Sequence, residues 1–167
     1  MDIRSALKSQ YRAALKMLHE VIEKCPDGMW NDPADHAAPF WRVAYHTLFY
    51  THFYLQQTQE AFRPWARHCE EAEFISSVPW EPHRPPKTCE PFTRNDLLEY
   101  CNECLAMIDV GVDTLDLSAP QCGFPWYKMS VLEHQIVNIR HLQHHTAALA
   151  SRLRREACIG IHWVGKG

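Results

Sequence analysis

The stretch that decides the fold is EHQIVNIRHLQHHTAALASRLR, residues 133–154. Apolar side chains recur in and just before it every three or four positions, which is the period of an amphipathic helix. The members of this apolar stripe are Val131, Leu132, Ile139, Leu142, Leu149 and Leu153. The pattern predicts a helix that opens at Met129 or Ser130 and continues to about Ala157, with His141 and His145 on the flank of its apolar stripe.

Three further segments have helical character. Residues 2–24 repeat apolar side chains at helical spacing, residues 39–60 begin with Pro39, and residues 93–115 begin with Thr93 as an N-cap. No internal repeat is present, and no alternating pattern is strong enough to build a sheet, so we expect at most a short strand in the tail. The sequence therefore predicts an all-α fold, a four-helix bundle of the up-and-down type, forming one domain over residues 1–167.

The connection between the second and third helices is long and rich in proline. Prolines at 64, 79, 82, 85, 86 and 91 exclude a continuous helix over residues 63–92, although residues 65–74 are compatible with a short one. We interpret this segment as a crossover that links the two helices. Its further role stays open.

Composition excludes several classes of protein. Hydrophobic residues make up 46% of the 167 residues and the net charge is about −3, so the chain suits a globular domain and lacks the basic face of a general nucleic-acid binder. Arg152, Arg154 and Arg155 near the end of the last helix are interpreted as cations that favour the helix dipole. The charged N-terminus contains no long apolar run, which argues against a signal peptide or a membrane span.

The cysteines favour a reducing compartment. There are seven, an odd number, and with no export signal we expect reduced thiols and a cytoplasmic protein. Cys101 and Cys104 form a lone CxxC within a helical pattern. No second CxxC completes a zinc site, so we interpret both as ordinary small helix residues.

Histidine is the unusual residue, with eleven copies. On the last helix His141 and His145 lie one turn apart, about 6 Å along the axis and roughly 40° around it, so both can bind the same ion. His144 turns to the solvated side. His134 stands about 10 Å before His141 and about 16 Å before His145, too far for one ion. Asn138, on the same face, is better placed to orient a ligand or substrate.

A third histidine strengthens the interpretation of this pair as metal ligands. A pair of histidines four residues apart is more often a surface feature than a metal site. His46, however, lies at the centre of the aromatic second helix, among Trp41, Tyr45, Phe49, Tyr50 and Phe53, where it needs a hydrogen-bond partner or a metal. A shared metal becomes at least as good an interpretation as a hydrogen-bonded core histidine.

Three stretches carry a resemblance to a known family. PFWRVAYHTLFY (39–50), NIRHLQHHTAALASRLR (138–154) and the closing WVGK (163–166) are similar to the DinB-like superfamily of four-helix-bundle metalloproteins, which includes YfiT-like and bacillithiol-transferase-like proteins. The resemblance implies a divalent ion, zinc or nickel, held by one histidine of the second helix and an HxxxH pair of the last. Those roles fall on His46, His141 and His145.

The chain also departs from the family pattern. Many relatives follow the last ligand with a polar run, whereas Thr146 and two alanines follow His145 here. Any substrate contact that the polar run supplies is therefore in doubt.

An open three-histidine site allows more than one chemistry. Three neutral imidazoles leave coordination positions free; zinc in such a site activates water near neutral pH, or it presents a thiolate to an electrophile. The expected function is a metal-dependent hydrolase or thiol S-transferase acting on a small-molecule substrate, the latter with a low-molecular-weight thiol. The alternative is a non-catalytic, stress-related metal- or ligand-binding protein.

No side chain stands out as a general base. The residues considered for it are Asp32, Asp35, Trp126, Tyr127 and Glu133, and for each a structural or solvated role is favoured. Because the ligands must be neutral, metal affinity is expected to fall below the ordinary histidine pKa of about 6.5.

The second helix also bears on association. Its large apolar side chains point in nearly every direction, more than one core face can absorb, so we expect a homodimer. The alternative is that residues 63–92 fold over the spare face.

Overall fold

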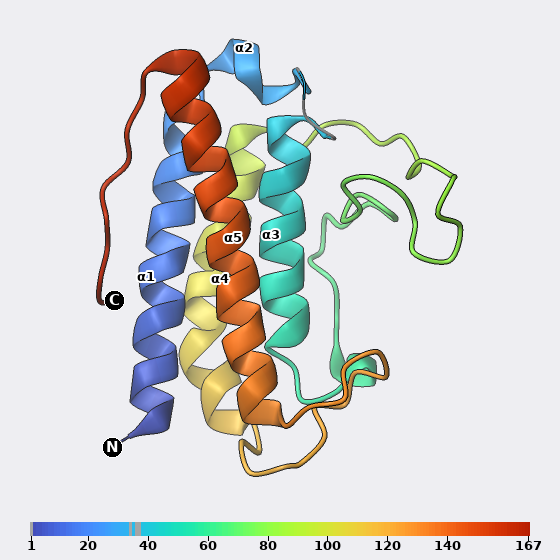
Figure 1. Ribbon diagram of the computed structural model, residues 1–167, viewed down its shortest axis with the longest axis vertical. Helices are drawn as coiled ribbons and strands as arrows, with labels where there is room; N and C mark the ends of the chain where they lie inside the picture. The colour runs from blue at the N-terminus through green and yellow to red at the C-terminus, as the bar shows by residue number, and fades with distance from the viewer. Residues whose placement is uncertain (1, 34, 36–37) are drawn as a thin grey trace.

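The computed structural model describes residues 2–33, 35 and 38–167 and is all-helical over these residues (Figure 1). Its helices are α1 (Ile3–Lys24), the single turn α2 (Asp27–Trp30), α3 (Phe40–Tyr54), α4 (Arg94–Thr114) and α5 (Val131–Ala157), with a 3-10 turn η1 (Gln59–Ala61). No strand is present in the described part of the chain, where one isolated bridge joins Val78 and Glu81. The all-α prediction is confirmed, and the tail at residues 158–167 contains no strand.

The helix starts follow from local capping. Asp2 accepts a hydrogen bond from the backbone of Arg4, and Ser130 accepts one from the backbone of Glu133. Thr93 and Asp96 form a reciprocal capping box at the start of α4. Each of these side chains satisfies a backbone N–H that has no partner inside the helix. The predicted starts agree with the structure to within about a residue.

The structure differs from the sequence-based interpretation at the end of α3 and in the segment that follows it. The helix expected to reach residue 60 ends at Tyr54, and the chain after it is bound to a distant loop, because the N–H of Gln59 donates to the carbonyl of Gly123 (3.2 Å). Residues 65–74, which the sequence left compatible with a short helix, form turns instead. Glu71 has a φ of 67°, in the left-handed region, which a right-handed helix cannot contain.

The long helices pack in a cyclic order. α1 contacts α4 and α5, and α3 contacts the same two helices from the other side (Figure 1). α3 and α4 run in the same direction: the thiol of Cys104 lies 3.9 Å from the carbonyl of Leu48, and further along both helices Gly111 lies against Leu55. A Cβ at Gly111 would meet the Leu55 side chain at 2.6 Å, so only glycine allows this approach.

This parallel pair explains why the connection is long. A chain that ends α3 at one end of the helices must return to the other end before it can start α4 beside it. Residues 55–93 make that return, along the side of α3 (Figure 1). The order of directions therefore differs from the up-and-down arrangement expected from the sequence, in which consecutive helices are antiparallel.

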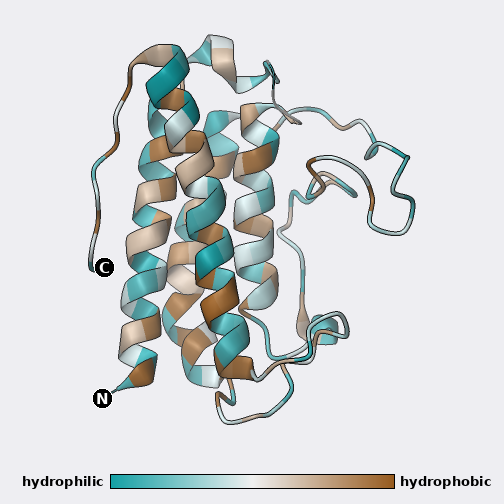
Figure 2. Ribbon diagram, viewed as in Figure 1, coloured by the Kyte–Doolittle hydropathy of each residue, from teal (hydrophilic) through white to brown (hydrophobic). Residues whose placement is uncertain are grey.

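The apolar side chains of the helices form a buried core. The ribbon of the loops is mostly teal or pale in Figure 2, whereas brown segments are most frequent on the helices. The connection adds its own aromatic side chains to the core, where Trp65 stacks on Tyr100 (4.6 Å between ring centroids) and Phe92 lies against Tyr45 (4.6 Å). These aromatic side chains cover part of α3 within one chain. This coverage is what the sequence analysis gave as the alternative to a dimer interface. Homodimerisation itself stays a prediction.

Charged side chains hold the connection in place. The buried Glu71 carboxylate binds the guanidinium of Arg84 through two hydrogen bonds (2.7 and 2.9 Å) and also accepts from the backbone N–H of Lys87 (2.8 Å). Arg42 of α3 donates to the carbonyls of Glu71 (3.4 Å) and Phe74 (3.3 Å). Residues 71–74 are therefore fixed beside α3, next to the turn that carries His46.

Two smaller expectations can be compared with the structure. Arg152 is buried, donating to the carbonyl of Asp32 (2.7 Å) and the carboxylate of Glu156 (3.0 Å), so its expected role as a solvated dipole cation applies only to the exposed Arg154 and Arg155. All seven cysteines lie in the described ranges and are free thiols. None of the described helices combines the length and apolar character needed to cross a membrane.

Candidate metal site

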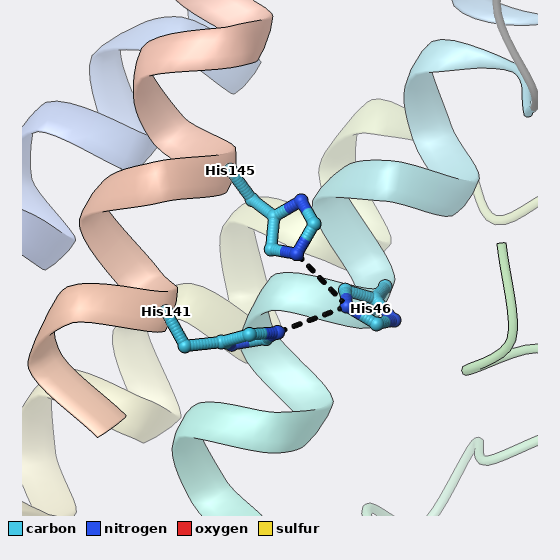
Figure 3. A group of neighbouring side chains, drawn as sticks. All are labelled: His46, His141 and His145. Atoms are coloured by element: carbon cyan, nitrogen blue, oxygen red, sulfur yellow. Dashed lines mark hydrogen bonds between the residues drawn. The ribbon is translucent and has the colours of Figure 1, made fainter. Parts of the chain in front are cut away.

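The structure brings together the three histidines that the sequence singled out (Figure 3). The Nε2 atom of His46 on α3 lies 3.0 Å from Nε2 of His141 and 3.1 Å from Nε2 of His145, both on α5. One nitrogen from each ring lies within 4.8 Å of the other two. Three imidazole nitrogens thus converge on one point between two helices, an arrangement that can hold a metal ion.

The hydrogen bond on the far side of His46 fixes its tautomer. Its Nδ1 lies 2.6 Å from the backbone carbonyl oxygen of Glu73. A carbonyl only accepts, so Nδ1 carries the proton and the neutral ring directs the Nε2 lone pair at His141 and His145. A metal-binding imidazole requires this tautomer, and a carbonyl partner of this kind commonly orients it.

The spacing of the rings also suits a metal. With zinc–nitrogen bonds of about 2.0–2.1 Å in a tetrahedral arrangement, two ligand nitrogens lie roughly 3.3 Å apart. The distances from His46 to its two partners are close to this value. The donor set, with imidazole nitrogens alone, fits zinc or nickel better than a hard cation such as magnesium.

Burial keeps the three rings neutral. It lowers the pKa of His46 to about 4, and it lowers the pKa of His141 and of His145 to about 3, with the neighbouring histidines adding to the effect on these two. Neutral imidazoles are the form that binds a metal, so no proton needs to leave before a cation enters near neutral pH.

Other histidines and polar residues of the same helix are used differently. His144 is exposed, as predicted, although its ring touches that of His145. His134 is 1% exposed and lies outside the cluster, as predicted, among the rings of Tyr54, Phe124 and Tyr127.

Two polar residues of α5, Asn138 and Thr146, form hydrogen bonds with backbone carbonyls outside the histidine cluster. The buried side chain of Asn138 donates to the carbonyl of Thr51 on α3 (3.0 Å). The hydroxyl of Thr146, directly after His145, donates back to the carbonyl of Leu142 (2.8 Å). Thr146, the first residue where the chain departs from the family's polar run, is buried in the helix packing.

The contribution of the connection was not anticipated, whereas Tyr50 was among the aromatic neighbours expected around His46. Glu73 supplies the carbonyl that orients His46, and burial raises the pKa of its own carboxyl. The ring of Tyr50 contacts both His46 (4.8 Å between centroids) and His141 (5.5 Å). A backbone acceptor that is 27 residues away in the sequence leaves no signal there, whereas Tyr50 lies one turn after His46, where helical spacing predicts a contact.

The side chains considered as bases divide into two groups. Asp32, Asp35 and Glu133 are exposed. Tyr127 lines a shallow hollow on the outer face of α5 together with His141, and Trp126 lines a separate cavity beside α3. Of the five side chains considered as bases, only Tyr127 and Trp126 therefore line a hollow or cavity next to the histidine cluster.

These observations define an all-helical protein with a three-histidine group that can hold a metal ion. The family model of the DinB superfamily matches residues 10–149, a range that includes all three histidines. The chain belongs to the DinB superfamily, which confirms the resemblance seen in the sequence. No curated protein and no solved structure gives a significant match to the chain.

Proposed function

We propose that His46, His141 and His145 bind one divalent ion, zinc or nickel, and that the protein is a metal-dependent enzyme acting on a small molecule. The observation that carries this proposal is the convergence of three neutral imidazole nitrogens, with His46 held in the metal-binding tautomer. Three protein ligands are typical of catalytic sites, whereas structural zinc sites commonly have four.

When bound, the ion would supply Lewis-acid activation of water, a thiol or a carbonyl group. The residues of the chain provide the rest. The carbonyl of Glu73 holds the ring of His46 in place, and the ring of Tyr50 covers one side of His46 and His141. Burial around the cluster excludes water from most of its surface and strengthens electrostatic interactions inside it.

Two hollows beside the cluster favour thiol S-transfer over hydrolysis. One lies on the outer face of α5 and is lined by His141, His144 and Arg140, whose cation suits a thiol that carries carboxylates. The other lies along α3 and contains Tyr50, which contacts the cluster. A reaction between two molecules needs two binding regions, whereas hydrolysis needs one. Hydrolase activity and non-catalytic metal or ligand binding are the alternatives.

The remaining features of the proposal concern the setting of the site. We propose that the long helices form the four-helix bundle of the superfamily, with residues 63–92 as its connection, and that the protein works in the reducing cytoplasm.

The homodimer expected from the sequence is tested by sedimentation at micromolar concentration. A monomer there would agree with the coverage of α3 by its own connection.

The test is an activity screen on metal-restored, tag-free protein. Ester and amide substrates are offered alone, and electrophiles are offered with and without a low-molecular-weight thiol. Thiol-dependent conjugation that is lost in His46→Ala and retained in His144→Ala supports the proposal. Turnover without thiol would show a hydrolase. Metal binding without turnover in any arm would identify a binding protein instead.

A further inference from the structure

A cavity of about 550 Å³ lies beside α3, next to the histidine cluster. It is bordered by the second half of α3, by the connection drawn in green beside that helix in Figure 1, and by the loop before α5. Its aromatic lining includes Tyr50, Phe53, Tyr54, Phe74, Trp80 and Trp126. This volume is in the range of small-molecule pockets, and an aromatic lining suits a flat organic molecule.

Two tryptophans of this lining are unusually exposed. Trp80 is 64% exposed with its ring edge against Phe74, and Trp126 is 52% exposed with its ring beside Phe53. Large aromatic side chains left open to water around one cavity mark a surface that a ligand covers. A flat ring that enters between them would bury apolar area from both sides.

The polar lining selects the charge of the ligand. Glu73 is the acidic residue in the lining, and no lysine or arginine occurs among the described residues that form it. Its carboxyl forms no salt bridge with the residues that the structure describes, and its Oε2 atom is buried without a hydrogen-bond partner among them. Carboxyl oxygens and aromatic faces both attract N–H donors and cations, and both disfavour anions.

The cavity and the cluster share a wall. The ring of Tyr50 lines the cavity and contacts His46 and His141. Glu73 lines the cavity with its side chain while its backbone carbonyl accepts the hydrogen bond from His46. A molecule in the cavity is therefore separated from the metal-binding rings by a single layer of side chains.

We propose that this cavity binds a planar aromatic molecule that carries an amine or another N–H donor, and that it excludes aromatic carboxylates. As a substrate pocket this rests on the proposed function, but the binding itself does not require the metal. The exposed tryptophans provide the aromatic faces and Glu73 provides the acceptor. The anionic partner of a two-substrate reaction then belongs to the hollow that contains Arg140.

The test compares two probes with the same ring system and opposite charge, tryptamine and indole-3-acetate. Binding to the full-length protein is measured by calorimetry, both metal-free and metal-loaded. We expect tryptamine to bind at least about fivefold more tightly than indole-3-acetate, in line with one cation–aromatic contact. We expect Trp80→Ala to weaken tryptamine binding by a similar factor and Glu73→Gln to reduce the preference between the probes.

Matched controls separate the cavity from nonspecific binding. Trp163 is 77% exposed in the tail and outside the lining, so Trp163→Ala should bind tryptamine like the wild type. Glu70→Gln removes a neighbouring exposed carboxylate that does not line the cavity. Equal affinity for the two probes, no binding of tryptamine, or equal effects of the two tryptophan variants would overturn the proposal. If metal-free protein binds tryptamine and metal-loaded protein shows no turnover, the proposed enzyme function is wrong while the proposal for the cavity stands.

Discussion

The Nδ1 atom of His46 donates a 2.6 Å hydrogen bond to the backbone carbonyl of Glu73. One residue belongs to the aromatic helix α3 and the other to the long connection between α3 and α4. The connection that returns the chain between two parallel helices thereby becomes part of the candidate metal site. Because the bond uses a backbone atom, it depends on the position of the connection and not on the side chain at residue 73.

The first prediction concerns metal content. Tag-free wild-type protein should carry close to one zinc or nickel ion per chain, measured by elemental analysis. Alanine at position 46, 141 or 145 should reduce affinity by at least about tenfold, because two imidazoles remain from a set of three.

Two histidines of the same helix serve as controls for this prediction. His144→Ala changes an exposed ring beside the cluster, and His134→Ala changes a buried ring outside it. Both variants should keep the wild-type stoichiometry. Wild-type metal content in a triple variant at 46, 141 and 145 would show that the assignment of the ligands is wrong.

The sequence specified the parts of this site that depend on local spacing. The interval between His141 and His145 places both on one face of a helix, and the aromatic surroundings of His46 indicated a ring that needs a partner. Helix starts were readable for the same reason, since Thr93 and Asp96 cap α4 through contacts three residues apart.

The parts that were missed depend on contacts between distant segments. The parallel run of α3 and α4 places Leu55 close to Gly111, a contact that periodicity does not reveal. The turn at Glu71 is stabilised by Arg84, 13 residues later. Glu71 has the positive φ that a helix over residues 65–74 could not contain, and it lies two residues before the Glu73 carbonyl that accepts from His46.

The second prediction is that metal affinity begins to fall at a lower pH than it would if the three histidines had their ordinary pKa of about 6.5. Protons compete with the ion for the same nitrogens, so affinity falls only where the metal-free site becomes protonated. Burial lowers the pKa of His46 to about 4 and that of His141 and His145 to about 3. Affinity should therefore be nearly constant from pH 7 to about 5 and fall below about pH 4, where the sequence alone suggested a fall from pH 6.5.

Competition against a chelator of known pH dependence measures this profile. The folded state is checked by circular dichroism at each pH, so that loss of metal is not confused with unfolding. A steady loss of affinity that begins at pH 6.5 in folded protein would contradict the effect of burial on these rings.

The third prediction concerns the anchor of the connection. Glu71→Gln removes the charge that binds the Arg84 guanidinium and the Lys87 N–H, and this contact holds the pKa of Glu71 down to about 2. We expect faster proteolysis within residues 63–92 and weaker metal binding, because the carbonyl of Glu73 loses its fixed position beside His46.

The control for this anchor is Glu70→Gln. Glu70 is exposed and pairs only with the side chain of Lys87 among the described residues, a contact of the kind that contributes little to stability. It should leave both the cleavage rate and the metal affinity close to wild type. Equal behaviour of the two variants would mean that the Glu71 contact does not position the connection.

The last prediction concerns His134, whose ring is buried and has no hydrogen-bond partner on either nitrogen among the described residues. A buried polar group without a partner costs about 1–3 kcal/mol, and leucine has a similar volume without that cost. His134→Leu should therefore raise the free energy of unfolding by about 1 kcal/mol in urea denaturation at pH 7 and leave the metal content unchanged. The matched change on the exposed side of the same helix, His144→Leu, should not stabilise the protein.

The difference in the free energy of unfolding between His134→Leu and the wild type should increase as the pH falls. Burial lowers the pKa of His134 to about 4, against about 6.5 in the unfolded chain, so between these values the unfolded state of the wild type binds more protons. The wild type therefore loses stability as the pH falls from about 6.5 to about 4, and the variant escapes that part of the loss. Denaturation curves of metal-free protein at pH 7, 6 and 5 should show a widening gap. A constant or shrinking gap would mean that His134 finds a partner for its proton in the folded protein.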